Sequence, residues 1–163
     1  MLLHLHVKNL ALIEEADLEF GHGLNILTGE TGAGKSILID AVNLALGGKA
    51  GAGIIRNGCD HAYVELVFSV DSEEKKRQLA ELEVECEEDD TLILSRKITK
   101  TRSIFKINDI TVTAAKVRKI TGLLIDIHGQ HEHQSLLYKT KHLSILDHYA
   151  KNELAKYKSN IVE

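Results

Sequence analysis

The most informative segment of the chain reads Gly29-Glu30-Thr31-Gly32-Ala33-Gly34-Lys35-Ser36, which fits the pattern G-x-x-x-x-G-K-[ST]. Residues 24–28 precede it and predict a short buried strand. The residues that follow predict a helix that is apolar on most of its surface, with Ile37, Leu38, Ile39, Ala41, Val42, Leu44, Ala45 and Leu46. Strand, glycine-rich loop and helix follow one another in the order of a P-loop.

A P-loop holds nucleotide phosphates mainly through its backbone. Its glycines let N–H groups lie against phosphate oxygens without obstruction by Cβ atoms, and those N–H groups open a helix whose positive dipole end favours an anion. Lys35 adds a charge at the β- and γ-phosphates, and the Ser36 hydroxyl can ligate Mg²⁺. The sequence predicts ATP and Mg²⁺ binding by Gly29, Glu30, Thr31, Gly32, Ala33, Gly34, Lys35 and Ser36. The alternative is a glycine-rich turn that matches the pattern by chance, but it would not explain why a predicted strand precedes it and a predicted helix follows it.

The composition indicates one cytoplasmic domain. A chain of 163 residues can bury roughly two-thirds of its unfolded surface. The net charge of −4 gives no general attraction to nucleic acid, so such a contact needs a local basic patch. Cys59 and Cys86 form neither a disulfide framework nor a metal-ligand spacing, which is typical of the reducing cytosol. We expect no signal peptide, no membrane-spanning segment and no membrane partner.

Alternating apolar and polar residues predict several further strands. They lie at residues 3–7, 16–20, 62–70, 91–98, 103–107 and 110–112, and the last three form a hairpin that turns again at Asn108-Asp109. We expect Asp71 to cap a helix that carries Leu79 and Leu82, and Thr113 to cap a short basic helix at residues 114–120. A second buried strand is predicted at residues 123–127. We therefore expect an α/β fold in which an antiparallel β-subdomain lies beside a mixed sheet, with the P-loop helix between the layers.

Positive charge is concentrated on the predicted hairpin. Its cationic residues are Arg96, Lys97, Lys100, Arg102 and Lys106. They predict either a solvated face, which is the commoner situation, or a contact with a DNA backbone. Arg56, in the loop after the P-loop helix, is likewise either a solvated turn residue or a phosphate contact.

Two residues compete for the role beside Mg²⁺. Asp126 ends an apolar run and resembles a Walker B aspartate, but the residues that follow it do not supply the glutamate expected of an ABC-type ATPase. Gln130 lies just past the same run and could reach both Mg²⁺ and the attacking water as a Q-loop glutamine. We favour Gln130 as the catalytic and metal-binding residue.

Two features near the C-terminal end allow more than one interpretation. His128, His131 and His133 could suggest zinc, but their spacing follows no familiar zinc pattern. From His142 onward, apolar residues recur at threes and fours, which predicts either the start of a coiled coil or an ordinary amphipathic helix. We therefore divide the chain into a lobe at residues 1–140 and a helix at residues 141–163.

Several segments together resemble the SMC-like branch of the ABC ATPases, in particular its bacterial DNA repair members. They are the start Met-Leu-x-x-Leu-x-Val-Lys-Asn, the run at residues 24–36, the segment Ile55-Arg56-Asn57-Gly58 and, above all, Asp126-Ile127-His128-Gly129-Gln130-His131-Glu132-His133-Gln134 followed by Leu136. The resemblance extends over essentially the whole chain.

The resemblance implies an ATPase head made of two sequence-distant lobes joined by a long coiled coil. Such a head dimerises around ATP and acts in cytoplasmic, nucleoid-associated repair of DNA double-strand breaks. Lys35 and Ser36 would then be the Walker A lysine and magnesium ligand, Gln130 the Q-loop glutamine, and Asn9 a residue near the nucleotide base. The implied partners are the C-terminal lobe, a second head and DNA.

The sequence lacks a Leu-Ser-Gly-Gly signature and a strand that ends in Asp-Glu. In the family these belong to the C-terminal lobe, so we expect this chain to be an N-terminal fragment that binds ATP with little or no turnover. Two other hypotheses remain open. One is a complete small P-loop kinase or NTPase with Asp126 as its Walker B residue, and the other is an interaction module with a vestigial nucleotide site.

Overall fold

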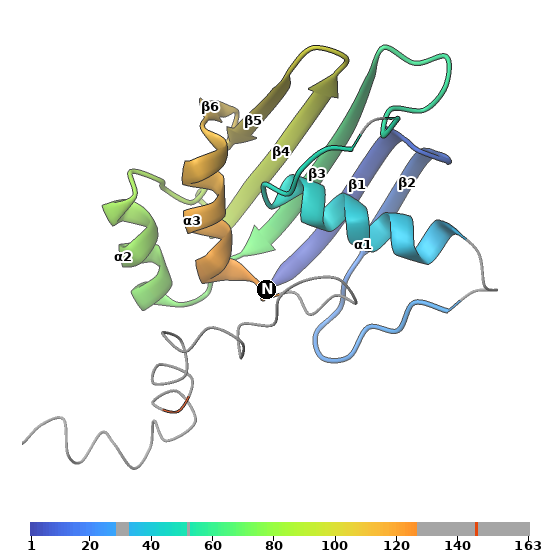
Figure 1. The fold of residues 1–163 in the computed structure, drawn as a ribbon. Coiled ribbons are helices and arrows are strands. Elements are labelled where there is room, and N and C mark those ends of the chain that lie inside the picture. Colours follow the sequence, from blue (N-terminus) through green and yellow to red (C-terminus); the bar gives the residue numbers. More distant parts are fainter. Residues whose placement is uncertain (29–32, 52, 127–145, 147–163) are drawn as a thin grey trace, which may run out of the picture. The chain divides into compact units, whose positions relative to one another are not determined.

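A single antiparallel sheet carries the part of the chain that the computed structural model describes, residues 1–28, 33–51, 53–126 and 146 (Figure 1). Its strands follow the order β2-β1-β3-β4-β5-β6. They are β1 (Leu2–Leu10), β2 (Ile13–Glu19), β3 (His61–Ser69), β4 (Thr91–Thr99), β5 (Ser103–Ile107) and β6 (Ile110–Val112). The helices are α1 (Ala33–Ala45), α2 (Glu73–Glu81) and α3 (Ala114–Leu124). The predicted antiparallel subdomain is confirmed.

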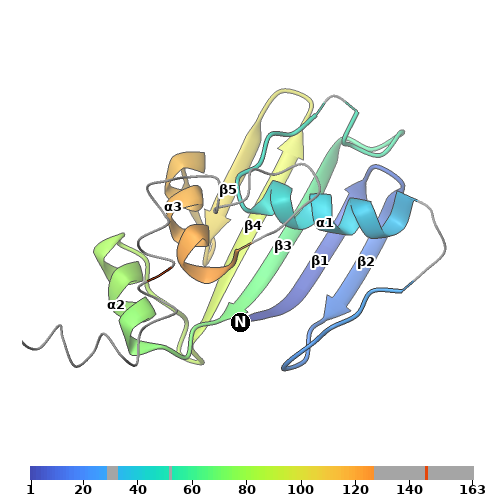
Figure 2. The ribbon, with the colours of Figure 1, turned by 60° about the horizontal axis from the view of Figure 1, so that its bottom comes forward.

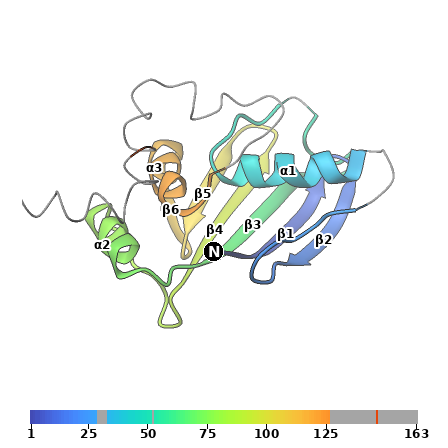
Figure 3. The same cartoon turned by 90° about the horizontal axis from the view of Figure 1, so that it is seen from below.

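One face of the sheet forms the core. Along β3, Ala62, Val64, Leu66 and Phe68 are fully buried, whereas the residues between them are only half-buried. Helices α1 and α3 cover this buried face (Figures 2 and 3). Apolar and polar residues alternate along the strand because successive side chains point to the packed face and to the open face in turn. In the described part of the chain, no helix is long and apolar enough to cross a membrane.

The turn between β5 and β6 follows from its two residues. Asn108 and Asp109 have positive φ values of 43° and 62°, and Ile107 pairs with Ile110 across them. Asparagine and aspartate tolerate this conformation, which matches the twist of a two-residue hairpin. The Asn108 side chain also accepts a hydrogen bond from the Ile93 N–H at 2.9 Å. The turn predicted from the sequence is confirmed.

The strand predicted at residues 24–28 is wrong for this structure. The segment has no regular secondary structure, and Leu24 and Ile26 are 86% and 72% exposed. An apolar strand that is buried on both faces needs neighbours on both sides, and no described strand pairs with this segment. The expected mixed sheet is therefore not formed by the described residues.

The strand predicted at residues 123–127 is also wrong for the part that is described. Helix α3 continues to Leu124, and Ile125 and Asp126 follow it without regular structure. Val117, Ile120 and Thr121 are buried, and their spacing keeps one side of the helix on the core. The expected cap is confirmed, because the Thr113 side chain accepts a hydrogen bond from the Lys116 N–H at 3.2 Å.

Helix α2 begins one residue later than the sequence predicted. Its N-cap is Ser72, whose side chain accepts from the Lys75 N–H, and Asp71 instead accepts from the Ser69 hydroxyl at 2.5 Å. Both residue types are good caps, so the sequence alone did not separate them. Leu79 is fully buried as expected, and Leu82 is the C-cap.

Helix α1 packs on one side only, in contrast to the expected position between two layers. Ala41, Leu44 and Ala45 are buried, whereas Ile39 on the opposite side is 47% exposed. The helix contacts β1, β3 and β4, so it crosses the sheet (Figure 1). It ends in a tight turn in which Gly47 has φ +97° and the Gly48 N–H donates to the Asn43 carbonyl at 2.9 Å.

Replacement of Gly47 by alanine is expected to lower the free energy of unfolding by about 1–2 kcal/mol, the cost of a left-handed conformation for a residue with a Cβ. The added Cβ would also lie 2.9 Å from Cγ of Arg118. Urea denaturation gives the measurement. The control is Gly122→Ala in α3, where the added Cβ meets nothing within 4 Å and alanine should stabilise the helix by up to about 1 kcal/mol. Equal effects of the two substitutions would contradict this account.

The two edges of the sheet differ in length and charge. Strand β2 has seven residues, and four of them are acidic, Glu14, Glu15, Asp17 and Glu19. Strand β6 at the other edge has three residues, of which Ile110 is 70% exposed.

Candidate nucleotide site and basic cleft

The N-terminus of α1 carries the two P-loop side chains that the structure describes. Lys35 and Ser36 lie in its first turn, where Lys35 is half-buried and Ser36 is exposed. The first turn contains no acidic residue. The positive end of the helix dipole is therefore not neutralised by a side chain of its own turn, which favours an anionic ligand.

Space at this end of α1 fits the close approach of a phosphate. A Cβ added to Gly34 would meet nothing within 4 Å, so the backbone is open on this side. An amine, a hydroxyl and the N–H groups of a helix N-terminus are donors that a nucleotide phosphate and Mg²⁺ require. The described residues are therefore compatible with the predicted ATP and Mg²⁺ site, and the assignment of Lys35 to the phosphates and Ser36 to the metal ion stays a prediction.

Several predicted site residues lie outside the described part of the chain. These are Gly29, Glu30, Thr31, Gly32, the side chain of Ala33, Gln130, and the three histidines His128, His131 and His133. The predicted helix at residues 141–163 also falls there, apart from Leu146. The assignments of these residues stay predictions.

Asn9 lies at the end of β1 in an unusual backbone conformation, with φ +54°. Its carbonyl accepts a hydrogen bond from the Arg56 N–H at 3.0 Å, and the neighbouring Ala11 N–H donates to the Ile54 carbonyl at 2.8 Å. These hydrogen bonds connect the end of β1 to the segment Ile55-Arg56-Asn57-Gly58, which is one of the segments that carry the family resemblance. A role of Asn9 at a nucleotide base stays a prediction.

Asp126 does not have the setting of a Walker B aspartate. It follows helix α3 rather than the end of a strand, and it is exposed. A Walker B residue is held at the carboxyl end of a core strand next to the P-loop strand. The structure thus does not supply the context on which the small-NTPase hypothesis depends.

A large cleft is lined by described residues that include neither Lys35 nor Ser36. It has a volume of about 960 Å³ and lies between the loop that follows α1 and the tip of the β4–β5 hairpin. We call it the basic cleft. Its cationic lining residues are Lys49, Arg56, Arg96, Lys100 and Arg102, and its acidic lining residue is Asp60. The sequence indicated that positive charge is concentrated on the hairpin, but it did not indicate that Lys49 lies in the same cleft as these residues.

Arg96 corrects the view of the hairpin as a uniformly solvated basic face. It is only 5% exposed, because even-numbered residues of β4 point to the core face. Arg56 is not simply a solvated turn residue, because its side chain has two partners. Its guanidinium donates to the Leu12 carbonyl at 2.7 Å and lies 3.4 Å from the carboxylate of Glu14.

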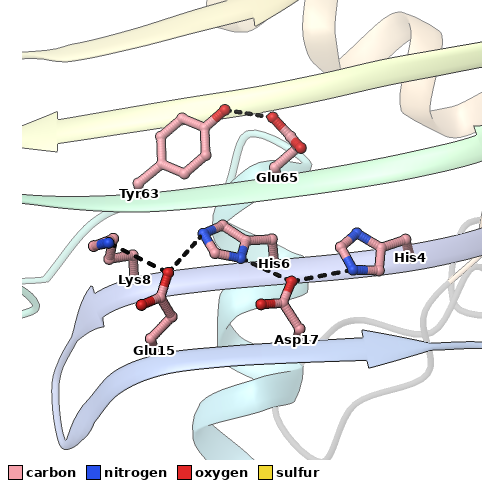
Figure 4. A network of polar contacts seen from close by, with 7 residues as sticks. All are labelled: His4, His6, Lys8, Glu15, Asp17, Tyr63 and Glu65. Atoms are coloured by element: carbon pink, nitrogen blue, oxygen red, sulfur yellow. Dashed lines mark hydrogen bonds and ion pairs between the residues drawn. The ribbon is translucent and has the colours of Figure 1, made fainter.

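A polar network occupies the open face of the sheet on β1, β2 and β3 (Figure 4). Asp17 accepts from His6 Nδ1 at 2.9 Å and lies 3.1 Å from His4 Nε2, and Glu15 lies 3.3 Å from the Lys8 amine. The hydrogen bond from His6 is the main reason why the pKa of Asp17 is lowered. On β3, burial and a hydrogen bond to Glu65 raise the pKa of Tyr63 to about 12. The alternation of His4 and His6 with acidic partners across the hairpin could have indicated this network.

The lowered pKa of Asp17 predicts a small loss of stability in acid. A depressed folded-state pKa contributes stability above the unfolded-state pKa, and this contribution disappears as the pH falls through the folded-state value. Wild type should therefore exceed Asp17→Asn in free energy of unfolding at about pH 6 but not at about pH 2.5. Urea denaturation at both pH values checks this. Glu19→Gln is the matched control, since Glu19 has no ion pair among the described residues. A difference that persists at the lower pH would refute the assignment.

Comparison with protein families gives the decisive observation, because the model described as "AAA domain" matches residues 4–161. The chain belongs to the AAA domain family. Among curated proteins with similar sequences, the DNA repair protein RecN of Halalkalibacterium halodurans is 45% identical over 151 residues, which is 92% of this chain. RecN of Bacillus subtilis is 40% identical over 155 residues. This AAA domain chain spans 27% of the length of each of the two.

Solved structures confirm the fold class. A structure titled as part of work on ATP-driven dimerization and DNA-stimulated activation of SMC ATPases matches 75% of this AAA domain chain and 78% of that chain, with a TM-score of 0.62 and 19% identity. The recombination mediator protein RecF matches over 72% of this chain and 29% of its own, with a TM-score of 0.56 and 18% identity. The fold is thus that of SMC and RecF ATPase heads, as the resemblance in sequence implied.

Proposed function

We propose that this chain is the ATP-binding N-terminal lobe of an SMC-like ATPase that acts in the recombinational repair of DNA double-strand breaks. The observation that carries the proposal is the N-terminus of α1, where Lys35, Ser36 and an open backbone at Gly34 lie on a helix turn without acidic residues. The similarity to RecN proteins supports the cellular role.

The direct test is calorimetric titration of the chain with ATP in the presence and absence of Mg²⁺. Binding should be tighter with Mg²⁺, because a metal ion held by Ser36 offsets the charge of the phosphates. No heat of binding in either condition would overturn the proposal.

Hydrolysis in this proposal needs the C-terminal lobe and a second head. Lys35, Ser36 and Gln130 bind and orient phosphates and metal, and the opposing signature motif and the Walker B acid come from elsewhere. Magnesium, when bound, would neutralise developing charge on the phosphates. The alternative of a complete small NTPase loses support because Asp126 follows a helix.

The basic cleft is the part of this lobe best suited to touch DNA. It gathers positive charge on a chain whose net charge is −4. Among the described residues, the side chains of Lys49, Lys100 and Arg102 have no ion-pair partner. Exposed cations on one cleft attract a phosphate backbone and release its counterions.

Replacement of both Lys100 and Arg102 by alanine should weaken binding of duplex DNA by the full-length protein that contains this chain. Each lost phosphate contact should reduce the slope of log K against log salt by about 1, so the double variant should lose about 2. Fluorescence anisotropy at several salt concentrations gives the slope. Arg77→Ala on the exposed side of α2 is the control and should leave the slope unchanged. A double variant with the wild-type slope would exclude the cleft as a DNA contact.

A further inference from the structure

Arg96 joins the P-loop helix to the β4–β5 hairpin. Its guanidinium donates to the carbonyls of Leu44 and Gly48 at 2.7 and 2.6 Å, and to the Ser103 hydroxyl at 3.1 Å. It also lies over the ring of Phe105, 4.4 Å from the centroid. Leu44 is in the last turn of α1, so a residue of β4 holds the end of the helix opposite to Lys35.

The charge of Arg96 is incompletely compensated. No acidic side chain among the described residues forms an ion pair with it, and its Nε is buried without a hydrogen-bond partner. Burial lowers the pKa of Arg96, although a guanidinium remains protonated in proteins. The last turn of α1 contains no basic residue, so its carbonyl dipoles attract this charge and offset part of the desolvation.

The same guanidinium lines the basic cleft together with Lys49, Lys100 and Arg102. A phosphate in the cleft would be an anionic partner for Arg96, which forms no ion pair with the described residues. Electrostatic interactions are stronger where water is excluded. The bound anion would therefore stabilise the conformation in which Arg96 donates hydrogen bonds to the carbonyls of Leu44 and Gly48.

We propose that Arg96 is a positioning residue that couples DNA phosphates in the basic cleft to the P-loop helix. The inference rests on the proposed function, since it assumes that ATP binds at the N-terminus of α1. Helix α1 has 13 residues and is about 20 Å long, so a contact that fixes one end also restrains the other. Figure 1 shows α1 running across the sheet as one helix. Thermodynamic linkage requires that ATP raises the affinity for DNA by the same factor by which DNA raises the affinity for ATP.

The test compares ATP affinity with and without a saturating duplex DNA of about 20 base pairs, which is about two helical turns. The full-length protein that contains this chain is titrated calorimetrically, and the ratio of the two dissociation constants is the coupling factor. In wild type we expect a factor of about 5 or more. In Arg96→Met the factor should fall to about 1, because the guanidinium that links the cleft to the C-terminal end of α1 is absent. Arg96→Lys keeps the charge but not the fork of donors, so its factor should fall between the two.

Lys97→Met is the matched control, because Lys97 is exposed on the opposite face of the same strand, and its factor should equal that of wild type. Thermal unfolding separates coupling from support of the fold: a lower melting temperature with an unchanged factor assigns Arg96 a structural role only and overturns the inference. If Arg96→Met does not fold, Arg96→Lys decides, and an unchanged factor in it overturns the inference as well. Wild type that binds both ligands without coupling also refutes it, whereas wild type that binds neither ligand refutes the proposed function.

Discussion

Lys35→Ala is expected to lower the affinity of the chain for Mg²⁺-ATP roughly ten- to a hundredfold. A hydrogen bond to a charged group contributes about 1.5–3 kcal/mol, and the alanine removes both the bond and the positive charge at the phosphates. The helix N-terminus and the backbone of the loop remain, so binding should weaken rather than vanish. Isothermal titration calorimetry measures both dissociation constants.

The control for this experiment is Lys119→Ala, because Lys119 is an exposed lysine of α3. It removes the same charge from the chain and should leave the affinity unchanged. A loss that is equal in the two variants would indicate a general effect of net charge. Equal affinity of Lys35→Ala and wild type would exclude the P-loop as the nucleotide site.

The isolated chain is expected to hydrolyse ATP at close to the background rate, and addition of the C-terminal lobe should restore turnover. Lys35, Ser36 and Gln130 are the proposed ligands of phosphate and magnesium, but no recognisable motif in this sequence supplies a general base or the donors of an opposing head. Each missing electrostatic donor costs about a hundred- to a thousandfold in rate. A coupled assay of phosphate release, with and without the added lobe, gives the comparison.

Two substitutions separate this expectation from the small-NTPase hypothesis. If the isolated chain is active, and Asp126→Asn abolishes the activity while Gln130→Ala does not, Asp126 acts as a Walker B residue and the two-lobe account fails. If activity appears only with the added lobe and is lost in Gln130→Ala, the Q-loop assignment of Gln130 gains its first direct support.

Local signals in the sequence predicted most of the antiparallel sheet. Strand β3 alternates strictly between buried and half-buried residues, and Asn108-Asp109 can adopt the positive φ values that the hairpin requires. These are short-range properties, in which a residue and its neighbours determine the outcome. They do not depend on packing against distant parts of the chain.

The errors have a common physical origin in short apolar runs. Residues 24–28 and 123–127 are each too short for periodicity to separate a strand from a helix or an unpaired segment. Helix α3, which begins after Thr113, continues through Leu123 and Leu124, and both side chains pack against the core. Residues 24–28 have no partner strand among the described residues, so their apolar character did not produce pairing.

The basic cleft and Arg96 could be predicted only in part. Sequence reasoning found the charges of the hairpin, but the burial of Arg96 depends on the carbonyls of Leu44 and Gly48, about fifty residues away in the chain. Contacts of that kind arise from tertiary packing and leave no local pattern. The P-loop assignment, in contrast, rested on one continuous segment and required no such contact.

The unequal edges of the sheet bear on how the protein behaves at high concentration. An exposed strand edge offers unpaired N–H and C=O groups to any other chain, and edge-to-edge pairing leads to aggregation. A second copy that pairs its β2 with this β2 would bring two rows of carboxylates from Glu14, Glu15, Asp17 and Glu19 together. The opposite edge offers only the three residues of β6. Repulsion between these carboxylates is expected to disfavour pairing of the longer described edge with a second copy, and the shortness of β6 limits pairing at the other.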